Sequence, residues 1–138
     1  MIKIAIFGNT YNGLITTYLK VLYEFLNQNN VSVLVEKELF QNAMIVDDCC
    51  LDNVEIIENE NFICDYAISI GGDGTFLKTA SLIGDKPIPV LGINIGRLGF
   101  LADVPAENMI QAVKAMLNGQ LITEERTLLK VERSDKIG

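Results

Sequence analysis

The chain has 138 residues, 49% of them hydrophobic and 21% charged, a globular balance that allows one domain with a core but not two full domains. A formal net charge of −7 argues against binding to a nucleic-acid backbone or an anionic membrane surface, since both need clustered Lys and Arg. The sequence has no histidine, so any proton abstraction falls to a carboxylate, lysine, tyrosine or cysteine.

The first quarter of the chain reads as a strand, a helix and a second strand. The apolar, β-branched run at 2–7 ends at Gly8-Asn9-Thr10 and predicts a buried strand. Apolar residues then recur at helical spacing, at Ile15, Leu19, Leu22 and Leu26. They predict an amphipathic helix over 12–29, which a second strand at 31–35 follows. This order is typical of the right-handed crossover unit of a parallel sheet.

The next segment is strongly acidic, with no Lys or Arg from Glu38 to Leu77. We predict a short helix near 37–45 and a solvated acidic connection near 47–61. The carboxylates of this segment are scattered rather than set at a coordinating spacing, so we predict no metal site among them.

The three cysteines, Cys49, Cys50 and Cys64, do not form a disulfide framework, because their number is odd and two of them are adjacent. We expect reduced thiols. The N-terminus lacks a signal-peptide layout, and no stretch approaches the roughly 20 apolar residues of a membrane helix. We therefore expect a cytoplasmic protein.

Two glycine-rich segments follow predicted strands in the second half of the chain. A third strand at 66–70 leads into GGDGT at 71–75, and a helix is predicted from about Thr75 to Ile83. A fourth strand, at 88–92, leads into a second glycine-rich stretch at 92–99.

A last helix is predicted to begin near Pro105, which suits a first helical turn, and to end at Gly119. Its apolar face consists of Met109, Ala112, Val113, Met116 and Leu117. Beyond it, apolar and polar residues alternate over 129–132, which predicts a half-exposed strand. The chain ends six residues later at Gly138, so we expect that a longer protein has been cut short.

The glycine-rich segments point to phosphate chemistry. In open α/β sheets, ligands bind beyond the carboxyl ends of the strands, and amide N–H groups leading into a helix cradle phosphate. Asp73 could accept a proton from a substrate hydroxyl, Thr75 could cap the helix or meet a phosphate, and Lys78 could meet an anionic group. The alternative is a tight turn in which Asp73 caps the helix. P-loop, GxGxxG and GxSxG motifs are absent from the sequence.

GGDGTFLK at 71–78, followed by GINIGRLGFL at 92–101, resembles the NAD kinases. GGDGT alone is shared with diacylglycerol and sphingosine-type lipid kinases and has a close relative in phosphofructokinases. The second motif, with its LGFL ending, favours the NAD kinases. The resemblance extends over roughly residues 1–135.

The resemblance implies a Rossmann-like N-terminal α/β domain with a doubly wound, mostly parallel sheet, over 1–121 in this chain. Residues 122–138 would begin the connection into an all-β C-terminal domain that the chain lacks. It also implies transfer of a phosphoryl group from ATP or inorganic polyphosphate to the 2′-hydroxyl of the adenosine ribose of NAD. Mg²⁺ or another divalent cation assists, and members assemble as homodimers or homotetramers.

The resemblance also implies the site residues. Asp73 matches the general base, and Phe100 matches an aromatic residue that lines the dinucleotide pocket. The other positions that match nucleotide-binding residues are Gly72, Gly74, Thr75, Lys78, Asn94 and Gly96. We expect Asp73→Asn to lower kcat far more than it weakens NAD binding, because a loose transition state requires positioning above all.

One element of the resemblance is missing from this sequence. The family's C-terminal domain contributes an Asn-Glu or Asn-Asp pair, whereas Asn59-Glu60 here lies upstream of GGDGT. We therefore expect this chain alone to bind NAD poorly and to turn over little. The remaining alternatives are a lipid kinase domain, which would not be expected to contain GINIGRLGFL, and a non-catalytic nucleotide-binding module, which would bind without turnover.

Overall fold

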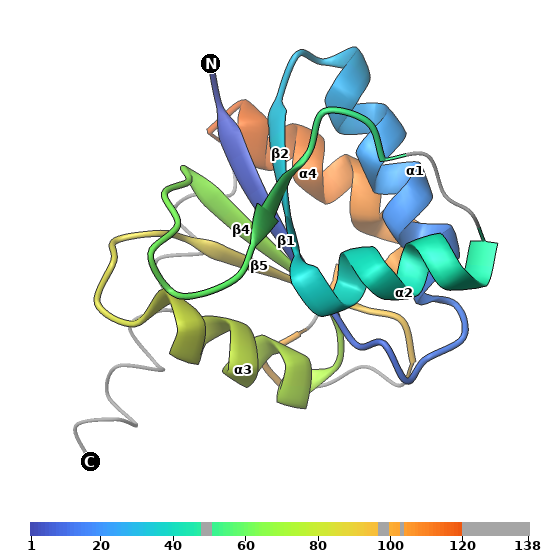
Figure 1. Cartoon of the computed structure of the whole chain (residues 1–138). Coiled ribbons are helices and arrows are strands. Elements are labelled where there is room, and N and C mark those ends of the chain that lie inside the picture. The colour runs from blue at the N-terminus through green and yellow to red at the C-terminus, as the bar shows by residue number, and fades with distance from the viewer. Residues whose placement is uncertain (48–50, 97–99, 103, 120–138) are drawn as a thin grey trace.

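A computed structural model describes residues 1–47, 51–96, 100–102 and 104–119 of the chain. Its centre is a parallel sheet of six strands in the order β3-β2-β1-β4-β5-β6 (Figure 1). The strands are β1 (Lys3–Gly8), β2 (Ser32–Glu36), β3 (Glu55–Ile57), β4 (Tyr66–Gly71), β5 (Val90–Asn94) and β6 (Val104–Pro105). The helices are α1 (Ile15–Gln28), α2 (Lys37–Asp47), α3 (Asp73–Ile83) and α4 (Met109–Leu117), with a 3₁₀ turn, η1 (Ala106–Asn108), before α4.

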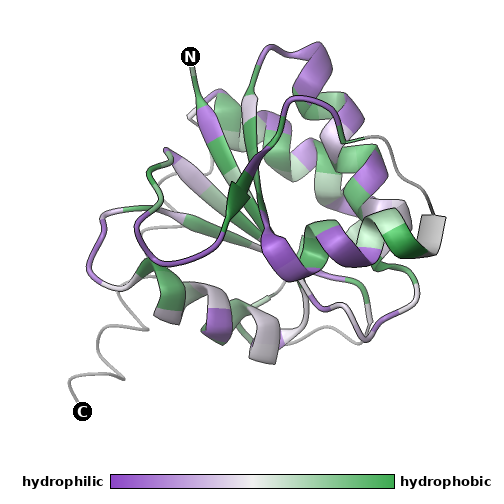
Figure 2. Cartoon of the chain, in the orientation of Figure 1, coloured by the Kyte–Doolittle hydropathy of each residue, from purple (hydrophilic) through white to green (hydrophobic). Residues whose placement is uncertain are grey.

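Helices cover both faces of the sheet, which confirms the doubly wound α/β prediction. Helices α1, α2 and α4 share one buried cluster with the sheet, and α3 packs in a second cluster on the opposite face (Figure 1). Side chains of β1 alternate between them, with Ile4 and Ile6 in the first cluster and Ala5 and Phe7 in the second. Figure 2 shows hydrophobic residues along the central strands and alternating with hydrophilic ones along the helices.

Local sequence accounts for where two of the helices end. Helix α1 ends at Gln28, and Asn30 then takes a left-handed conformation with φ of 58°. Gly119 follows α4 with φ of 79°, and its N–H donates to the carbonyl of Met116. A residue without a Cβ adopts this backbone conformation without strain, so the predicted end of the last helix is confirmed.

Two short strands were missed in the sequence. Strand β3 lies inside the segment predicted to be a solvated acidic connection, where it pairs with β2 and buries Ile57. Three residues are too few to show an alternating pattern. Pro105 belongs to the two-residue strand β6 rather than to the first turn of a helix, because it sits beside Asn94 at the sheet edge. An edge strand tolerates a proline, since it leaves one row of backbone groups unpaired.

Two boundaries near the glycine-rich segments differ from the prediction. Helix α3 begins at Asp73 rather than near residue 75. Strand β5 runs to Asn94, so Gly92 is a buried strand residue and not the start of a loop. A Cβ at Gly92 would lie 2.7 Å from the Phe76 ring and 2.8 Å from Cα of Ala102, which explains a glycine inside the strand.

Some predictions lie outside the described residues. They are the strand at 129–132, the boundary between 121 and 122, and the state of Cys49 and Cys50. Among the described helices, none combines the length and apolar character needed to cross a membrane. Cys64 is a buried free thiol, as expected.

Candidate functional site

The two glycine-rich motifs meet at the carboxyl end of the sheet. The strand order changes direction between β1 and β4, and this is where doubly wound sheets form a ligand crevice. The loop after β1 is joined to β4, since the N–H of Asn9 donates to the carbonyl of Ile70 at 3.0 Å. The second motif is joined to the first, since the N–H of Ile95 donates to the carbonyl of Gly71 at 3.1 Å.

The glycines of the first motif serve different purposes. A Cβ at Gly71 would lie 2.4 Å from Oγ1 of Thr75, so this glycine is required by packing. Cβ atoms at Gly72 and Gly74 would meet nothing within 4 Å. Packing against the described part of the chain therefore does not explain these two glycines, whereas the close approach of a ligand to the backbone would explain them.

Helix α3 begins without a side-chain cap. Gly72 is its N-cap and no side chain hydrogen-bonds there, so Thr75 does not cap the helix, and the alternative in which Asp73 caps it is wrong as well. Thr75 lies within the first turn, beneath Gly71. The first N–H groups of a helix have no partner in the helix, and together with the helix dipole they favour an anion at this end.

Asp73 is the most heavily bonded side chain of the site. Its Oδ2 accepts the N–H of Phe100 at 2.8 Å, and its Oδ1 accepts the N–H groups of Leu101 and Ala102, both at 2.9 Å. These bonds, the one from Ala102 above all, hold the pKa of Asp73 below its ordinary value because they stabilise the ionised carboxylate. Asp73 is therefore charged at neutral pH.

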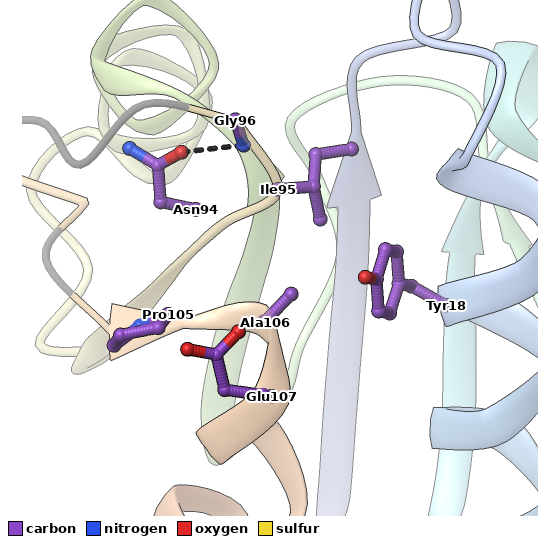
Figure 3. Close-up of a pocket in the computed structure, with 7 residues that line it drawn as sticks. All are labelled: Tyr18, Asn94, Ile95, Gly96, Pro105, Ala106 and Glu107. Carbon is purple, nitrogen blue, oxygen red and sulfur yellow. Dashed lines mark hydrogen bonds between the residues drawn. The ribbon is translucent and has the colours of Figure 1, made fainter.

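The side chain of Asn94 is hydrogen-bonded to the backbone of the second motif and of the residue that follows it. Its side chain is only 3% exposed, so the residue is shielded from solvent at the end of β5. Its Nδ2 donates to the carbonyl of Ala102 at 3.2 Å, and its Oδ1 accepts the N–H of Gly96 at 2.7 Å (Figure 3). The predicted role of Asn94 in nucleotide binding is thus accompanied by a structural one that the sequence did not indicate.

A pocket of about 200 Å³ opens beside Asn94. Figure 3 shows it between α1, which contributes Tyr18, and the β6–η1 segment, which contributes Pro105 and Glu107. A Cβ at Gly96 would approach the Oδ1 of Asn94 no closer than 3.8 Å. Asn94 and Gly96, which line this pocket, were predicted from the second motif, whereas Tyr18 and Glu107 belong to no motif and the sequence offered no signal for them.

Phe100 and Lys78 lie on different sides of Asp73. Phe100 is 73% exposed, and its backbone N–H donates to Asp73, so the main chain of Phe100 and the carboxylate lie together. The Nζ of Lys78 instead lies 3.8 Å from Oε2 of Glu36, at the end of β2. Since β2 and β5 are on opposite sides of β4, Lys78 faces away from the second motif.

Glu36 was not identified from the sequence as a site residue. It lines a pocket of about 240 Å³ with Lys78, Ile57 and Leu82. Burial raises the pKa of Glu36, and the nearby charge of Lys78 opposes that rise. Its position directly after the run at 31–35 was the available signal, because the carboxyl ends of parallel strands share one edge of the sheet.

The chain is similar to known proteins over most of its length. A family model described as the ATP-NAD kinase N-terminal domain matches residues 4–121. An NAD kinase of Bacteroides fragilis is 41% identical over 137 residues, covering 97% of this chain and 46% of the relative. An NAD kinase of Methanothermobacter thermautotrophicus is 51% identical over 77 residues, covering 56% of this chain and 27% of the relative.

The fold is also similar to that of a solved structure. The crystal structure of yeast NADH kinase complexed with NADH matches with a TM-score of 0.72 and 18% identity, covering 87% of this chain and 39% of that one. At this identity the likeness shows the fold alone. The chain spans about half the length of the curated relatives that match nearly all of it. It covers 46% of the NAD kinase of Bacteroides fragilis and 47% of that of Flavobacterium psychrophilum.

Proposed function

The chain belongs to the NAD kinase family, and on that premise we propose that the intact protein phosphorylates NAD. The phosphoryl group would pass from ATP or inorganic polyphosphate to the 2′-hydroxyl of the adenosine ribose, giving NADP. The observation that supports this most is the position of Asp73, an ionised carboxylate at the start of α3, between two glycines with open space and the exposed ring of Phe100.

The geometry suits phosphoryl transfer, which depends mainly on positioning and on charge stabilisation. The uncapped start of α3, with Gly72 and Gly74, gives phosphate oxygens access to backbone N–H groups. Asp73 would orient the ribose hydroxyl and take its proton late. Its lowered pKa is compatible with that role, because a loose transition state requires little activation of the nucleophile.

A divalent cation such as Mg²⁺ is implied by the family. Among the described residues, no group of three or more His, Cys, Asp or Glu side chains could hold a metal ion. Asp73 also has most of its acceptor positions occupied by backbone N–H groups. This part of the chain therefore does not fit a protein-built metal cage, and we assign no step of the reaction to a metal here.

We also propose a cytoplasmic enzyme that assembles as a homodimer or homotetramer. Both parts of this proposal rest on the family resemblance. Light scattering on the intact protein would measure its mass in solution, and a monomeric mass would exclude the oligomer.

The proposal is tested by measuring NADP formation with a coupled NADP-specific dehydrogenase. The intact protein is incubated with NAD, Mg²⁺ and either ATP or polyphosphate, and the 138-residue chain is assayed beside it. We expect turnover by the intact protein and little or none by the chain alone. Absence of turnover with both donors in the intact protein would refute NAD kinase activity.

A further inference from the structure

The backbone at 100–102 is held by two site residues from different motifs. Asp73, from α3, accepts the N–H groups of all three residues. Asn94, from β5, donates to the carbonyl of Ala102 at 3.2 Å. Ala102 is fully buried, and both its N–H and its carbonyl are hydrogen-bonded to these two side chains. Phe100, at the other end of the segment, presents a ring that is 73% exposed.

The two oxygens of Asp73 are used unequally. An ionised carboxylate has about four acceptor positions, roughly two on each oxygen. Oδ1 accepts two N–H groups and Oδ2 accepts one. Among the described residues Oδ1 is therefore fully used, and the remaining acceptor position belongs to Oδ2, the oxygen that also binds the N–H of Phe100.

We propose that Asp73 and Asn94 are positioning residues that hold the 100–102 segment, and that Asp73 meets substrate through Oδ2 alone. In this arrangement the Phe100 ring and the substrate-binding oxygen form one unit, and the placement of the ring depends on the charge of Asp73. The part concerning substrate rests on the proposed function. The part concerning the 100–102 segment does not.

The charge of Asp73 is what this unit requires. A protonated carboxyl would turn one acceptor oxygen into a hydroxyl donor facing backbone N–H groups, and an asparagine would place an NH₂ group there. The hydrogen bonds from the backbone at 100–102, that from Ala102 above all, favour the ionised carboxylate and so lower the pKa of Asp73. Asp73→Asn therefore removes the proton acceptor and also an acceptor of the backbone N–H groups at 100–102. The sequence alone predicts mainly a lower kcat, but with this second loss we expect the KM for NAD to rise as well.

The first experiment follows the amide protons of the segment by NMR in the intact protein, labelled with ¹⁵N in phenylalanine, leucine and alanine. We expect the amide protons of Leu101 and Ala102 to shift on acidification, with a midpoint below the ordinary value of about 3.9 for Asp. In Asp73→Asn this titration should vanish, and the Phe100 amide should exchange with solvent about tenfold faster.

The matched control is Asp65→Asn. Asp65 also accepts a backbone N–H, that of Lys3 at 2.8 Å, but at the opposite end of the sheet. This variant should leave all three amide resonances unchanged. If these resonances in the parent protein do not titrate, or titrate equally in Asp73→Asn, the role of Asp73 in holding the segment is wrong. The parent titration needs no variant, so a variant that fails to fold leaves the inference testable.

The second experiment separates binding from turnover. Asn94→Asp keeps an oxygen for the N–H of Gly96 and loses the donor to Ala102. Because Asn94 is largely buried and donates to the backbone of Ala102, we expect the KM for NAD to rise about tenfold with a smaller change in kcat. In Asp73→Asn both constants should worsen, and in Asp65→Asn neither.

The outcomes distinguish the two parts of the inference. An unchanged KM in Asn94→Asp, with the amide resonances moved, would overturn the link between the segment and substrate. If the parent protein formed no NADP, the proposed function would fail, whereas the titration would still decide whether Asp73 holds the segment.

Discussion

Gly74 offers a test of whether the open glycines exist for a ligand. It lies in the first turn of α3, it is exposed, and a Cβ there would meet no described residue within 4 Å. Alanine is favoured over glycine in helices by about 0.5–1 kcal/mol. Gly74→Ala should therefore stabilise the fold by up to about 1 kcal/mol, which corresponds to a rise in Tm of about 2–4 °C for a chain of this size.

The same substitution should impair activity. A methyl group at this position would occupy the space through which a nucleotide approaches the backbone, so we expect KM for NAD or for the donor to rise at least about tenfold. The assays are thermal unfolding by circular dichroism and NADP formation by the intact protein. A stabilised variant with unchanged KM values would refute the assignment of Gly74 to the ligand site. A destabilised variant would refute the open space described around it.

Gly92→Ala is the matched control, because the chain itself fills the space at Gly92. The added Cβ would lie 2.8 Å from Cα of Ala102, a backbone atom that cannot turn away. Overpacking of this kind costs about 1–3 kcal/mol. Gly92→Ala should therefore lower the Tm, in contrast to Gly74→Ala.

Three further predictions follow from the described structure. Burial raises the pKa of the Cys64 thiol to about 11, so in a variant with Cys49 and Cys50 replaced by serine, iodoacetamide should label Cys64 slowly at pH 8 and quickly after denaturation. Rapid labelling of the folded chain would contradict the burial. The pKa of Asp73 is lowered in the folded state, so the stability contributed by the ionised carboxylate is present above the unfolded-state pKa and is lost as the pH falls through the folded-state pKa. Denaturant titrations from pH 6 to pH 2 should show a fall in the free energy of unfolding below about pH 4, and this fall should be smaller in Asp73→Ala. Phe76 is fully buried beneath Gly92, so Phe76→Ala should cost about 3–5 kcal/mol in chemical denaturation, and a cost below about 1 kcal/mol would show that the ring is not in the core.

The sequence predicted the main elements of the fold well. The apolar runs at 2–7, 31–35 and 66–70 became β1, β2 and β4, because a strand buried on both faces is apolar at nearly every position. The errors concern short edge strands and glycine-rich boundaries. Strand β5 was ended too early because Gly92 was taken as the start of a loop, whereas the glycine makes room for Phe76.

The structure brings some of the predicted site residues together, and the roles predicted for them stay predictions. Asp73, Asn94 and Phe100 do come together, and the loop that follows each strand end explains why. Lys78 does not join them, because its position on α3 directs it to Glu36 at the end of β2. Periodicity placed Lys78 on a helix, but the neighbours of that helix depend on the order of the strands.

By itself, the sequence determined the alternation of strands and helices, the place of both glycine-rich motifs after strands, and the family that they resemble. Only the tertiary structure decided that the Asp73 carboxylate binds backbone N–H groups 27 to 29 residues away. The physical reason is that these donors are main-chain groups, present at nearly every residue and invisible in the residue pattern. The register that sets Gly71 beside Asn94 brings them within reach, and that register forms only when β4 and β5 pair.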